Sequence, residues 1–274
     1  MTSSLPPTLA DRLRESRGVL VGMWVCSGSP VMAEICAGSG LDWILIDAEH
    51  SPQSLSEMQV QLQAIAAYPV VPAVRVASDD PVTLKQVLDL GVQNVIVPMV
   101  STAEQALRIV EATSYPPRGI RGIGSALARS GRWGRVGDYL QNANDYVSVT
   151  VQIETAEAVG NIEQILAVDG IDAVFVGPSD LAASMGLIGR QSHPDVVASV
   201  KSVFEAAKSV GKPVGVNAFD PTLAREYVDA GADFILVGSD VTLVARGSEA
   251  LADRFGNEQL GGSEASGSSN AASY

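Results

Sequence analysis

Short apolar runs alternate with longer amphipathic segments along most of the chain. Runs of four to seven residues rich in Val, Ile and Leu are typical of strands buried on both faces, and the longer segments repeat their apolar residues with a helical period. The pattern predicts eight strands, at Val19 to Val25, Trp43 to Asp47, Val71 to Val76, Asn94 to Val100, Ser148 to Ile153, Ala173 to Val176, Pro213 to Val216 and Asp233 to Val237. It predicts helices at Pro30 to Gly38, Ser54 to Ala67, Pro81 to Leu90, Thr102 to Thr113, Ala156 to Ala167, Pro194 to Val210, Pro221 to Ala230 and Val241 to Phe255.

Prolines and glycines mark several of these helix boundaries. Pro81 follows the acidic Asp80, as a proline does in the first turn after an N-cap. Gly91, Gly211 and Gly231 stand where a helix C-cap needs a left-handed residue. The boundaries therefore support the alternation of strand and helix.

Eight strand–helix units predict an α/β fold, the TIM (β/α)8 barrel. An open doubly wound sheet is the alternative. It is disfavoured because the first strand is followed by Ser27-Gly28-Ser29-Pro30 and not by a glycine-rich phosphate turn.

Two segments do not follow the alternation. The segment from Tyr115 to Trp133 is long for a connection within a compact domain, so we expect a functional flap or an interface loop. Residues 257–274 are rich in Gly, Ser and Ala, which predicts a disordered tail. The domain prediction is a single barrel over residues 1–256.

Composition excludes several classes of partner. The 274 residues carry 31 acidic and 18 basic side chains, and a net charge of −13 argues against nucleic acid and anionic membranes. No apolar run approaches the ~20 residues of a membrane span, and the N-terminus lacks a signal-peptide pattern, so we expect a cytoplasmic protein. Cys26 and Cys36 lie in apolar contexts, which favours free thiols over a disulfide.

Polar residues cluster where the predicted strands end. In a parallel barrel these carboxyl ends share one rim, where such enzymes keep their chemistry. The second strand brings Asp47, Glu49 and His50, the third Arg75, the fifth Gln152 and Glu154, and the sixth Gly177, Ser179 and Asp180.

Each of these side chains has a functional and a structural interpretation. Glu154 and Asp180 are suitable ligands for Mg²⁺, Mn²⁺ or Co²⁺, or are helix caps. Arg75 needs an anionic or carbonyl partner, which is a ligand or a structural ion pair with Asp47 or Glu49. His50 is a general base or a hydrogen-bonded loop histidine.

A Schiff-base mechanism needs a lysine at this rim. The chain has four lysines, and all lie on predicted helices or at the start of the seventh strand: Lys85, Lys201, Lys208 and Lys212. None is placed at the rim, so metal-assisted (class II) chemistry is favoured over a lysine-dependent route.

Five motifs, in order between about Gly18 and Phe255, resemble the HpcH/HpaI aldolase family, in particular its 4-hydroxy-2-oxoheptanedioate aldolases of aromatic compound catabolism. They are Leu45-Ile46-Asp47-Ala48-Glu49-His50, Pro72-Ala73-Val74-Arg75, Tyr115-Pro116-Pro117-Arg118-Gly119-Ile120-Arg121-Gly122, Val151-Gln152-Ile153-Glu154-Thr155 and Phe175-Val176-Gly177-Pro178-Ser179-Asp180-Leu181. The resemblance implies a TIM barrel, a divalent metal ion, pyruvate and an aldehyde as products, and a homo-oligomer, usually a hexamer.

The resemblance also implies roles for matching residues. Glu154 and Asp180 would bind the metal, and Gln152 and the backbone at Ser179 would hold pyruvate, with Gly177 and Asp180 beside it. Arg75 would stabilise the enolate oxygen, and His50 would accept the proton directly or through a metal-bound water, with Asp47 in support. Family members usually have alanine at position 179, so the serine leaves the backbone role intact.

Asp89 matches the aspartate that raises the basicity of the family's histidine. A residue at the end of the third predicted helix belongs at the bottom of its own barrel, so its partner should be His50 of a neighbouring subunit. Two other functions remain open. They are a citrate-lyase-β-like or malyl-CoA-lyase-like enzyme, which would need a basic nucleotide patch, and a non-catalytic barrel; a phosphosugar aldolase is disfavoured.

Overall fold

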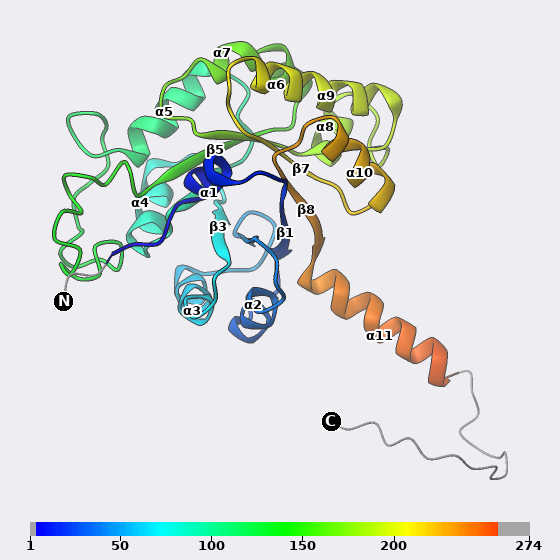
Figure 1. Ribbon diagram of the computed structural model, residues 1–274, viewed down its shortest axis with the longest axis horizontal. Coiled ribbons are helices and arrows are strands. Elements are labelled where there is room, and N and C mark those ends of the chain that lie inside the picture. The colour runs from blue at the N-terminus through cyan, green and yellow to red at the C-terminus, as the bar shows by residue number, and fades with distance from the viewer. Residues whose placement is uncertain (1–3, 257–274) are drawn as a thin grey trace, which may run out of the picture. The chain divides into compact units, whose positions relative to one another are not determined.

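The computed structural model describes residues 4–256. The chain divides into two compact units, Met1–Asp240 and Val241–Tyr274, which are described separately. In the first unit, eight parallel strands close into a barrel in sequence order (Figure 1). The strands are β1 (Leu20–Val25), β2 (Trp43–Asp47), β3 (Val71–Arg75), β4 (Asn94–Val97), β5 (Ser148–Ile153), β6 (Ala173–Val176), β7 (Val214–Asn217) and β8 (Phe234–Ser239). The predicted TIM barrel is confirmed.

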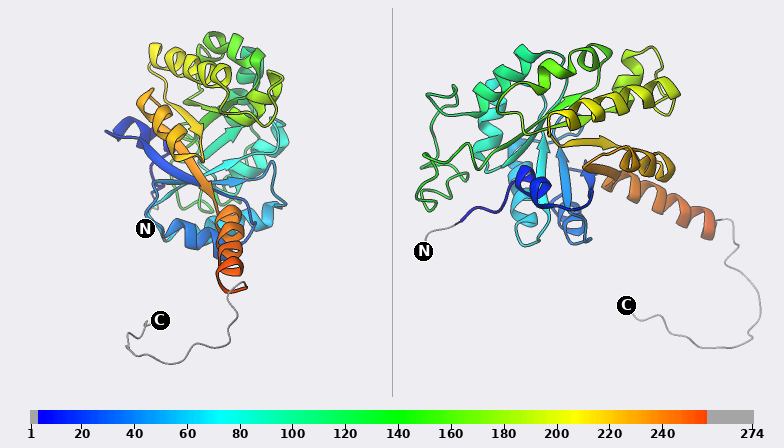
Figure 2. Two further views of the ribbon diagram at one scale, coloured as in Figure 1. Left: turned by 90° about the vertical axis from the view of Figure 1, so that its right-hand side faces the viewer. Right: turned by 45° about the horizontal axis from the view of Figure 1, so that its top comes forward.

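Helices surround the strands of this unit, as the two views of Figure 2 show. They are α1 (Leu9–Glu15), α2 (Pro30–Ala37), α3 (Leu55–Ile65), α4 (Pro81–Asp89), α5 (Ala103–Thr113), α6 (Ala156–Gly160), α7 (Ile162–Leu166), α8 (Pro178–Ser184), α9 (Pro194–Ser209) and α10 (Pro221–Asp229). Since each helix runs back against its strand, the carboxyl ends of the strands and the amino ends of the helices share one rim.

Three helix predictions were wrong or incomplete. Helix α1 was not predicted, although Thr8 and Asp11 form a capping box at its start. The apolar pattern did not predict helix α8; only the interpretation of Asp180 as a cap expected a helix there, from Leu181, and the helix begins at Pro178 in the first helical position. The single helix expected from Ala156 to Ala167 is divided at Asn161, whose side chain turns away to donate to the backbone of Ser101.

Large aromatic side chains fill the interior of the barrel. The rings of Trp43, Phe175 and Phe234 lie with centroids 5.4 to 6.3 Å apart, and all three side chains are buried. They fit because glycine stands opposite them: a Cβ on Gly22 would overlap Trp43, and one on Gly215 would overlap Phe234. The interior is therefore a packed core below the rim.

A short motif recurs before the even-numbered strands. A glycine with φ between 86° and 109° is followed by an apolar and then a polar residue, in Gly40-Leu41-Asp42, Gly91-Val92-Gln93, Gly170-Ile171-Asp172 and Gly231-Ala232-Asp233. The three aspartates accept hydrogen bonds from the preceding strand, at 2.8 to 2.9 Å, from the backbone N–H groups of Val21, Val149 and Val214 respectively. These carboxylates therefore join neighbouring strands at the bottom of the barrel.

Replacing Asp172 by alanine should lower the free energy of unfolding by about 1–3 kcal/mol, because the buried Val149 N–H would lose its side-chain acceptor. Asp172→Asn keeps an acceptor oxygen and should lose less. Asp169→Ala, at an exposed position, is the matched control. Chemical denaturation measures all three, and equal stability of Asp172→Ala and Asp169→Ala would contradict this role.

The long segment after α5 is held by specific contacts. The backbone N–H groups of Ile120 and Arg121 donate to carbonyl oxygens of Glu111 and Ser114 at the end of α5. Further along, a small apolar cluster forms from Tyr115, Val136, Tyr139 and Ala143. The segment is therefore packed on the bottom half of the barrel unit and does not cover the rim within its own chain.

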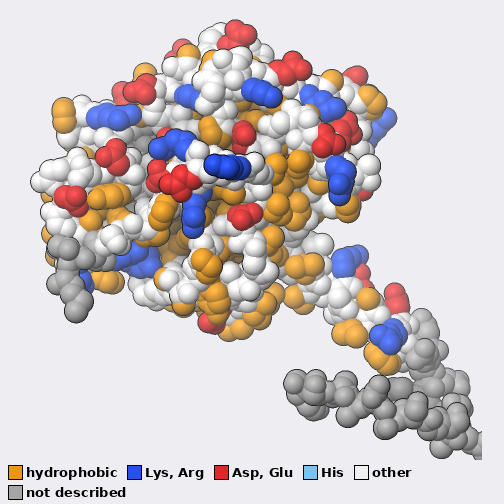
Figure 3. Space-filling model, in the orientation of Figure 1, with side chains coloured by type: hydrophobic (Ala, Val, Ile, Leu, Met, Phe, Trp, Pro, Cys, Tyr) orange, Lys and Arg blue, Asp and Glu red, His pale blue; other side chains and the backbone are white. Residues whose placement is uncertain are grey.

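In the second unit the described element is α11 (Asp240–Gly256). The tail predicted for residues 257–274 lies outside the described residues. None of the helices in residues 4–256 has the length and apolarity to cross a membrane. On the face shown in Figure 3, basic side chains of the barrel unit are interspersed with acidic ones.

Candidate active site

A cavity of about 280 Å³ opens at the carboxyl ends of the strands. Seven of the predicted site residues line it: Asp47, His50, Arg75, Gln152, Gly177, Ser179 and Asp180. The structure thus brings together, from β2, β3, β5 and β6, the residues that the sequence placed at one rim. Glu49 and Glu154 lie directly behind this wall, in contact with Arg75 and Gln152 respectively.

Arg75 is the centre of an ion-pair network. Its Nε and Nη2 lie 2.9 Å from the two carboxylate oxygens of Asp47, and its Nη1 lies 2.9 Å from Oε2 of Glu49. The indole of Trp24 covers the guanidinium at 4.3 Å. The structural ion pair expected for Arg75 is therefore present with both acids, and it fixes the guanidinium plane at the cavity wall.

Glu154 is a buried carboxylate with two donors. Its Oε1 accepts from the backbone N–H of Met99 at 2.6 Å, and its Oε2 accepts from the side-chain amide of Gln152. Burial raises the pKa of Glu154, and the neighbouring charges of Asp180 and Glu49 raise it further, against the lowering effect of the two hydrogen bonds. A cation at this point would offset the cost of burying the negative charge of Glu154 and the repulsion from Asp180 and Glu49.

The interpretation of Glu154 and Asp180 as helix caps was wrong. Thr155 is the N-cap of α6, and its hydroxyl accepts from the backbone of Ala158. Helix α8 begins three residues earlier than the cap interpretation required, so Asp180 lies in its first turn and Gly177 is the N-cap, without a side-chain cap bond. Both carboxylates therefore lie at the rim without a capping role.

The donor set fits a hard divalent cation. The carboxylates of Asp47 and Glu49 contact the guanidinium of Arg75, and those of Glu154 and Asp180 add two further negative charges at the same rim. Burial raises the pKa of Glu49 as well as that of Glu154. The buried Oε1 of Gln152 has no hydrogen-bond partner. Within residues 4–256 no group of three His, Cys, Asp or Glu side chains is arranged to hold a metal ion. A Mg²⁺ site can use one or two carboxylates together with water and ligand oxygens, so the pair Glu154 and Asp180 is compatible with one.

His50 lies at the mouth of the cavity. Its side chain is 67% exposed, and its Nε2 lies 3.8 Å from Oε2 of Glu49. Among the described residues the imidazole makes no hydrogen bond that would fix it in the loop. A histidine in this position can exchange protons with a ligand in the cavity.

Asp89 is not part of this cavity. It ends α4 at the opposite end of the barrel from the rim, as its position in the sequence predicts. Its Oδ1 accepts from Nη2 of Arg121 at 2.9 Å, and the guanidinium of Arg121 is fully buried and stacks on Tyr115 at 4.6 Å. Any action of Asp89 on a histidine at the rim must therefore occur in another copy of the chain.

Sequence reasoning missed several residues of the site. Trp24 lies one residue before the end of β1, and Asn217 is the last residue of β7. In the sequence neither residue gives a sign that it faces a cavity. Met99 reaches Glu154 through its backbone, with a φ of 59° that is unusual for a residue with a side chain. Phe219 and Cys26 also line the cavity, and burial raises the pKa of the Cys26 thiol to about 11.

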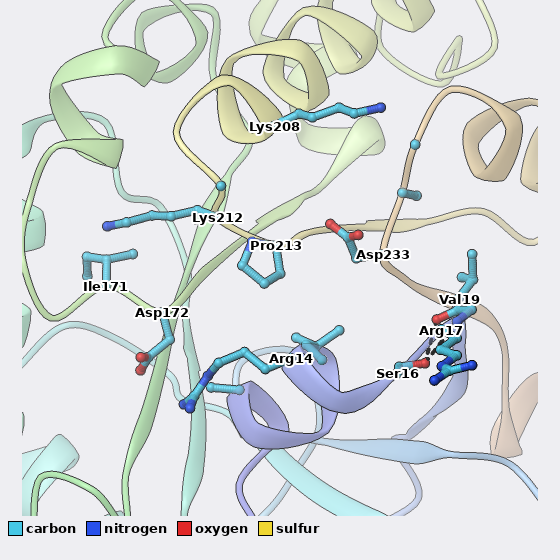
Figure 4. A pocket seen from close by; sticks show the side chains of 16 residues that line it. Arg14, Ser16, Arg17, Val19, Ile171, Asp172, Lys208, Lys212, Pro213 and Asp233 are labelled. Atoms are coloured by element: carbon cyan, nitrogen blue, oxygen red, sulfur yellow. Dashed lines mark hydrogen bonds between the residues drawn. The ribbon is translucent and has the colours of Figure 1, made fainter.

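A larger cavity, of about 700 Å³, lies at the bottom of the barrel unit (Figure 4). Its lysines do not converge, because Lys208 and Lys212 point in opposite directions, and Lys212 Nζ donates to the carbonyl of Val168. Its acids Asp172 and Asp233 hold neighbouring strands. The smaller cavity is therefore the candidate active site.

The fold and the site define a class of protein: a (β/α)8-barrel enzyme whose rim joins carboxylates, one arginine and one histidine. As predicted, no lysine lines this cavity among the described residues.

The chain belongs to the HpcH/HpaI aldolase/citrate lyase family, whose profile matches residues 20–247. It is 51% identical over 237 residues to a 4-hydroxy-2-oxo-heptane-1,7-dioate aldolase of Shigella flexneri, covering 86% of this chain and 89% of that one. The enzyme of the same name from Salmonella dublin is 50% identical over 239 residues, covering 87% and 91%. A solved family protein from Burkholderia cenocepacia J2315 superposes with a TM-score of 0.87 at 39% identity, covering 91% and 99%. The protein is thus an aldolase-type carbon–carbon lyase.

Proposed function

We propose that this protein is a class II pyruvate aldolase, which reversibly cleaves 4-hydroxy-2-oxo acids to pyruvate and an aldehyde with the help of a divalent metal ion. The observation that carries the proposal is the buried carboxylate of Glu154, which lies behind the cavity wall at Gln152 and is repelled by the charge of Asp180, while Asp180 and Arg75 line the cavity itself. The names of the relatives agree with this reaction.

The residues at β5 and β6 would bind the oxo acid. Glu154 and Asp180 would hold the metal ion, and the side-chain amide of Gln152 with the backbone at Gly177 and Ser179 would hold pyruvate. When bound, the cation would stabilise negative charge on the C2 oxygen of the substrate. Gly177 matters here because a Cβ would lie 3.0 Å from Glu154 Oε2 and would narrow this part of the cavity.

Arg75 and His50 would carry the bond cleavage. The C4 hydroxyl gives its proton to His50 as the C3–C4 bond breaks, and the electron pair of that bond forms the pyruvate enolate while C4 becomes the aldehyde carbon. The enolate then takes a proton at C3. Arg75 stabilises the developing oxyanion because Asp47 and Glu49 already hold its planar fork in place.

Two alternatives are less well supported. A citrate-lyase-β-like or malyl-CoA-lyase-like enzyme would need cations for a nucleotide, yet Arg75 is the one arginine or lysine that lines the cavity among the described residues. A non-catalytic barrel has no need for a buried carboxylate whose pKa is raised beside two further acids.

Metal removal tests the proposal. Pyruvate release from 4-hydroxy-2-oxo acids should be abolished by EDTA and restored by Mn²⁺, Co²⁺ or Mg²⁺, because the four carboxylates otherwise repel the anionic substrate. Circular dichroism of the EDTA-treated protein controls for unfolding. Full activity of metal-free protein would exclude class II chemistry, and a failure to release pyruvate from any such acid in the presence of metal would favour the non-catalytic barrel.

A further inference from the structure

The position of His50 depends on the loop that carries it. The imidazole lies at the mouth of the cavity, and its ring makes no hydrogen bond among the residues that the structure describes. Residues 48–53 form this loop and lead from β2 toward α3. At its start the backbone N–H groups of Glu49 and His50 donate to Oδ1 of Asp47, at 3.1 and 3.4 Å. This oxygen also accepts from Arg75, so three donors share it, and they hold only the first half of the loop.

Gln53 holds the other half of the loop. Its amide nitrogen, Nε2, donates to the backbone carbonyl of Asp47 at 2.7 Å and, more weakly, to that of Val25 at 3.5 Å. Asp47 and Val25 are the last residues of β2 and β1, which are neighbouring strands of the barrel. The side chain of Gln53 therefore ties the end of the loop back to two strands at the rim.

Gln61 on α3 fixes the orientation of the Gln53 amide. Its side chain is fully buried, and its nitrogen donates to Oε1 of Gln53 at 2.7 Å and to the backbone carbonyl of Glu57 at 3.3 Å. A backbone carbonyl can only accept, so the carbonyl of Glu57 turns the nitrogen of Gln61 toward itself. The second hydrogen of this nitrogen meets the oxygen of Gln53, and the nitrogen of Gln53 must then face the strands.

A buried amide is a costly way to pack the inner face of α3. Oε1 of Gln61 is buried and has no hydrogen-bond partner among the described residues. The other buried side chains of this helix are apolar: Met58, Leu62 and Ile65. An apolar residue of similar size at position 61 would avoid the cost of the unpaired atom. The amide therefore needs an explanation other than packing, and its contact with Gln53 supplies one.

We propose that Gln53 and Gln61 are positioning residues for the catalytic base, and that they hold the loop after β2 where His50 reaches the C4 hydroxyl of the substrate. This inference rests on the proposed aldolase function, in which His50 takes the proton of that hydroxyl. Neither glutamine lines the cavity, so both act through the loop backbone. The pair of Asp47 and Arg75 does not depend on them, because these two residues face each other in the ladder between β2 and β3.

Two reactions of the full chain with Mn²⁺ separate the base from the enolate site. Cleavage of a 4-hydroxy-2-oxo acid requires a base that takes the C4 hydroxyl proton. Decarboxylation of oxaloacetate breaks its C3–C4 bond with loss of CO2, and the electron pair of that bond forms the same pyruvate enolate without a base. In Gln61→Met we expect kcat for cleavage to fall by about 10- to 100-fold, the scale for a displaced catalytic group, while decarboxylation is unchanged.

Gln53→Glu tests the same role at a half-buried position. The carboxylate can still accept from Gln61, but it has no hydrogen for the carbonyl oxygens of Asp47 and Val25, so the same difference between the two reactions is expected. Hydrogen–deuterium exchange in the loop peptide should also rise in both variants, because the loop has lost a tie. Gln63→Met, at an exposed position of the same helix, is the matched control and should change neither reaction nor exchange.

The outcomes separate this inference from the function beneath it. An equal fall of cleavage and decarboxylation would overturn the positioning role, because it would indicate general damage to the site, and so would wild-type cleavage by both variants. Thermal melts show whether Gln61→Met is folded; if it is not, Gln53→Glu decides. A wild-type protein that neither cleaves nor decarboxylates these acids in the presence of Mn²⁺ would overturn the aldolase proposal, and the positioning role with it.

Discussion

Replacing Arg75 by lysine should lower kcat by at least ~10²-fold, the scale of losing one oxyanion donor. The charge is kept, but a single ammonium cannot meet both oxygens of Asp47 and Oε2 of Glu49, each of which now lies 2.9 Å from a guanidinium nitrogen. Both carboxylates would then repel the enolate. Steady-state kinetics of pyruvate release measure the effect.

The control for this variant is Arg118→Lys. Arg118 is half exposed and lies 3.6 Å from the fully exposed Asp169, so its ion pair should contribute little and activity should stay at the wild-type level. Thermal melts of both variants check that the fold is intact. Wild-type turnover by Arg75→Lys would remove Arg75 from the mechanism.

The barrel could be predicted because its strands have a local signature. The strand from Trp43 to Asp47 is buried along its whole length, so its sequence is an almost continuous apolar run. Both of its predicted ends are correct. Strand ends shifted where the backbone leaves the extended form: β4 ends at Val97, and Met99, with a φ of 59°, precedes the predicted end at Val100. The missed helices α1 and α8 are seven residues each, too short to show a helical period clearly.

The charged residues of the site could be predicted because a charge at the end of an apolar strand has few structural uses. Trp24, Asn217 and Met99 could not, because their roles depend on contacts between distant parts of the chain: Trp24 with Arg75 and Asn217, and the Met99 backbone with Glu154. No spacing rule in one sequence reports such contacts. These contacts could therefore be recognised only in the three-dimensional structure.

The positively charged partner of Asp89 also could not be predicted from the sequence. Arg121 lies 32 positions later and reaches Asp89 because the backbone after α5 is tied to the end of that helix. The ion pair holds Oδ1 of Asp89, and the side chain of Asp89 remains 28% exposed. One oxygen of a fixed carboxylate is thus available at the surface of the barrel unit, where it can meet another copy of the chain.

We propose that the protein is a homo-oligomer, a hexamer by resemblance, in which Asp89 of one chain supports His50 of its neighbour. Asp89 and His50 lie at opposite ends of one barrel, so each pair must join two chains. Asp89→Ala and His50→Ala should each be inactive as pure oligomers, because every pair then lacks one of its two side chains. Mixing the two variants under conditions of subunit exchange should restore activity, because some interfaces then pair an intact Asp89 with an intact His50.

The size of the recovery distinguishes a shared site from a structural role. At equal mixing, a random neighbour supplies the missing group at a quarter of the interfaces, so about a quarter of wild-type activity is the expected upper level for pairwise sharing. The control is a mixture of Asp138→Ala with His50→Ala. Asp138 is an exposed acid in the same segment as Arg121, so this mixture measures the activity that remains when active subunits are diluted with inactive ones. Native mass spectrometry verifies the exchange. If mixed oligomers form and stay inactive, Asp89 serves only to hold Arg121 at the end of α4.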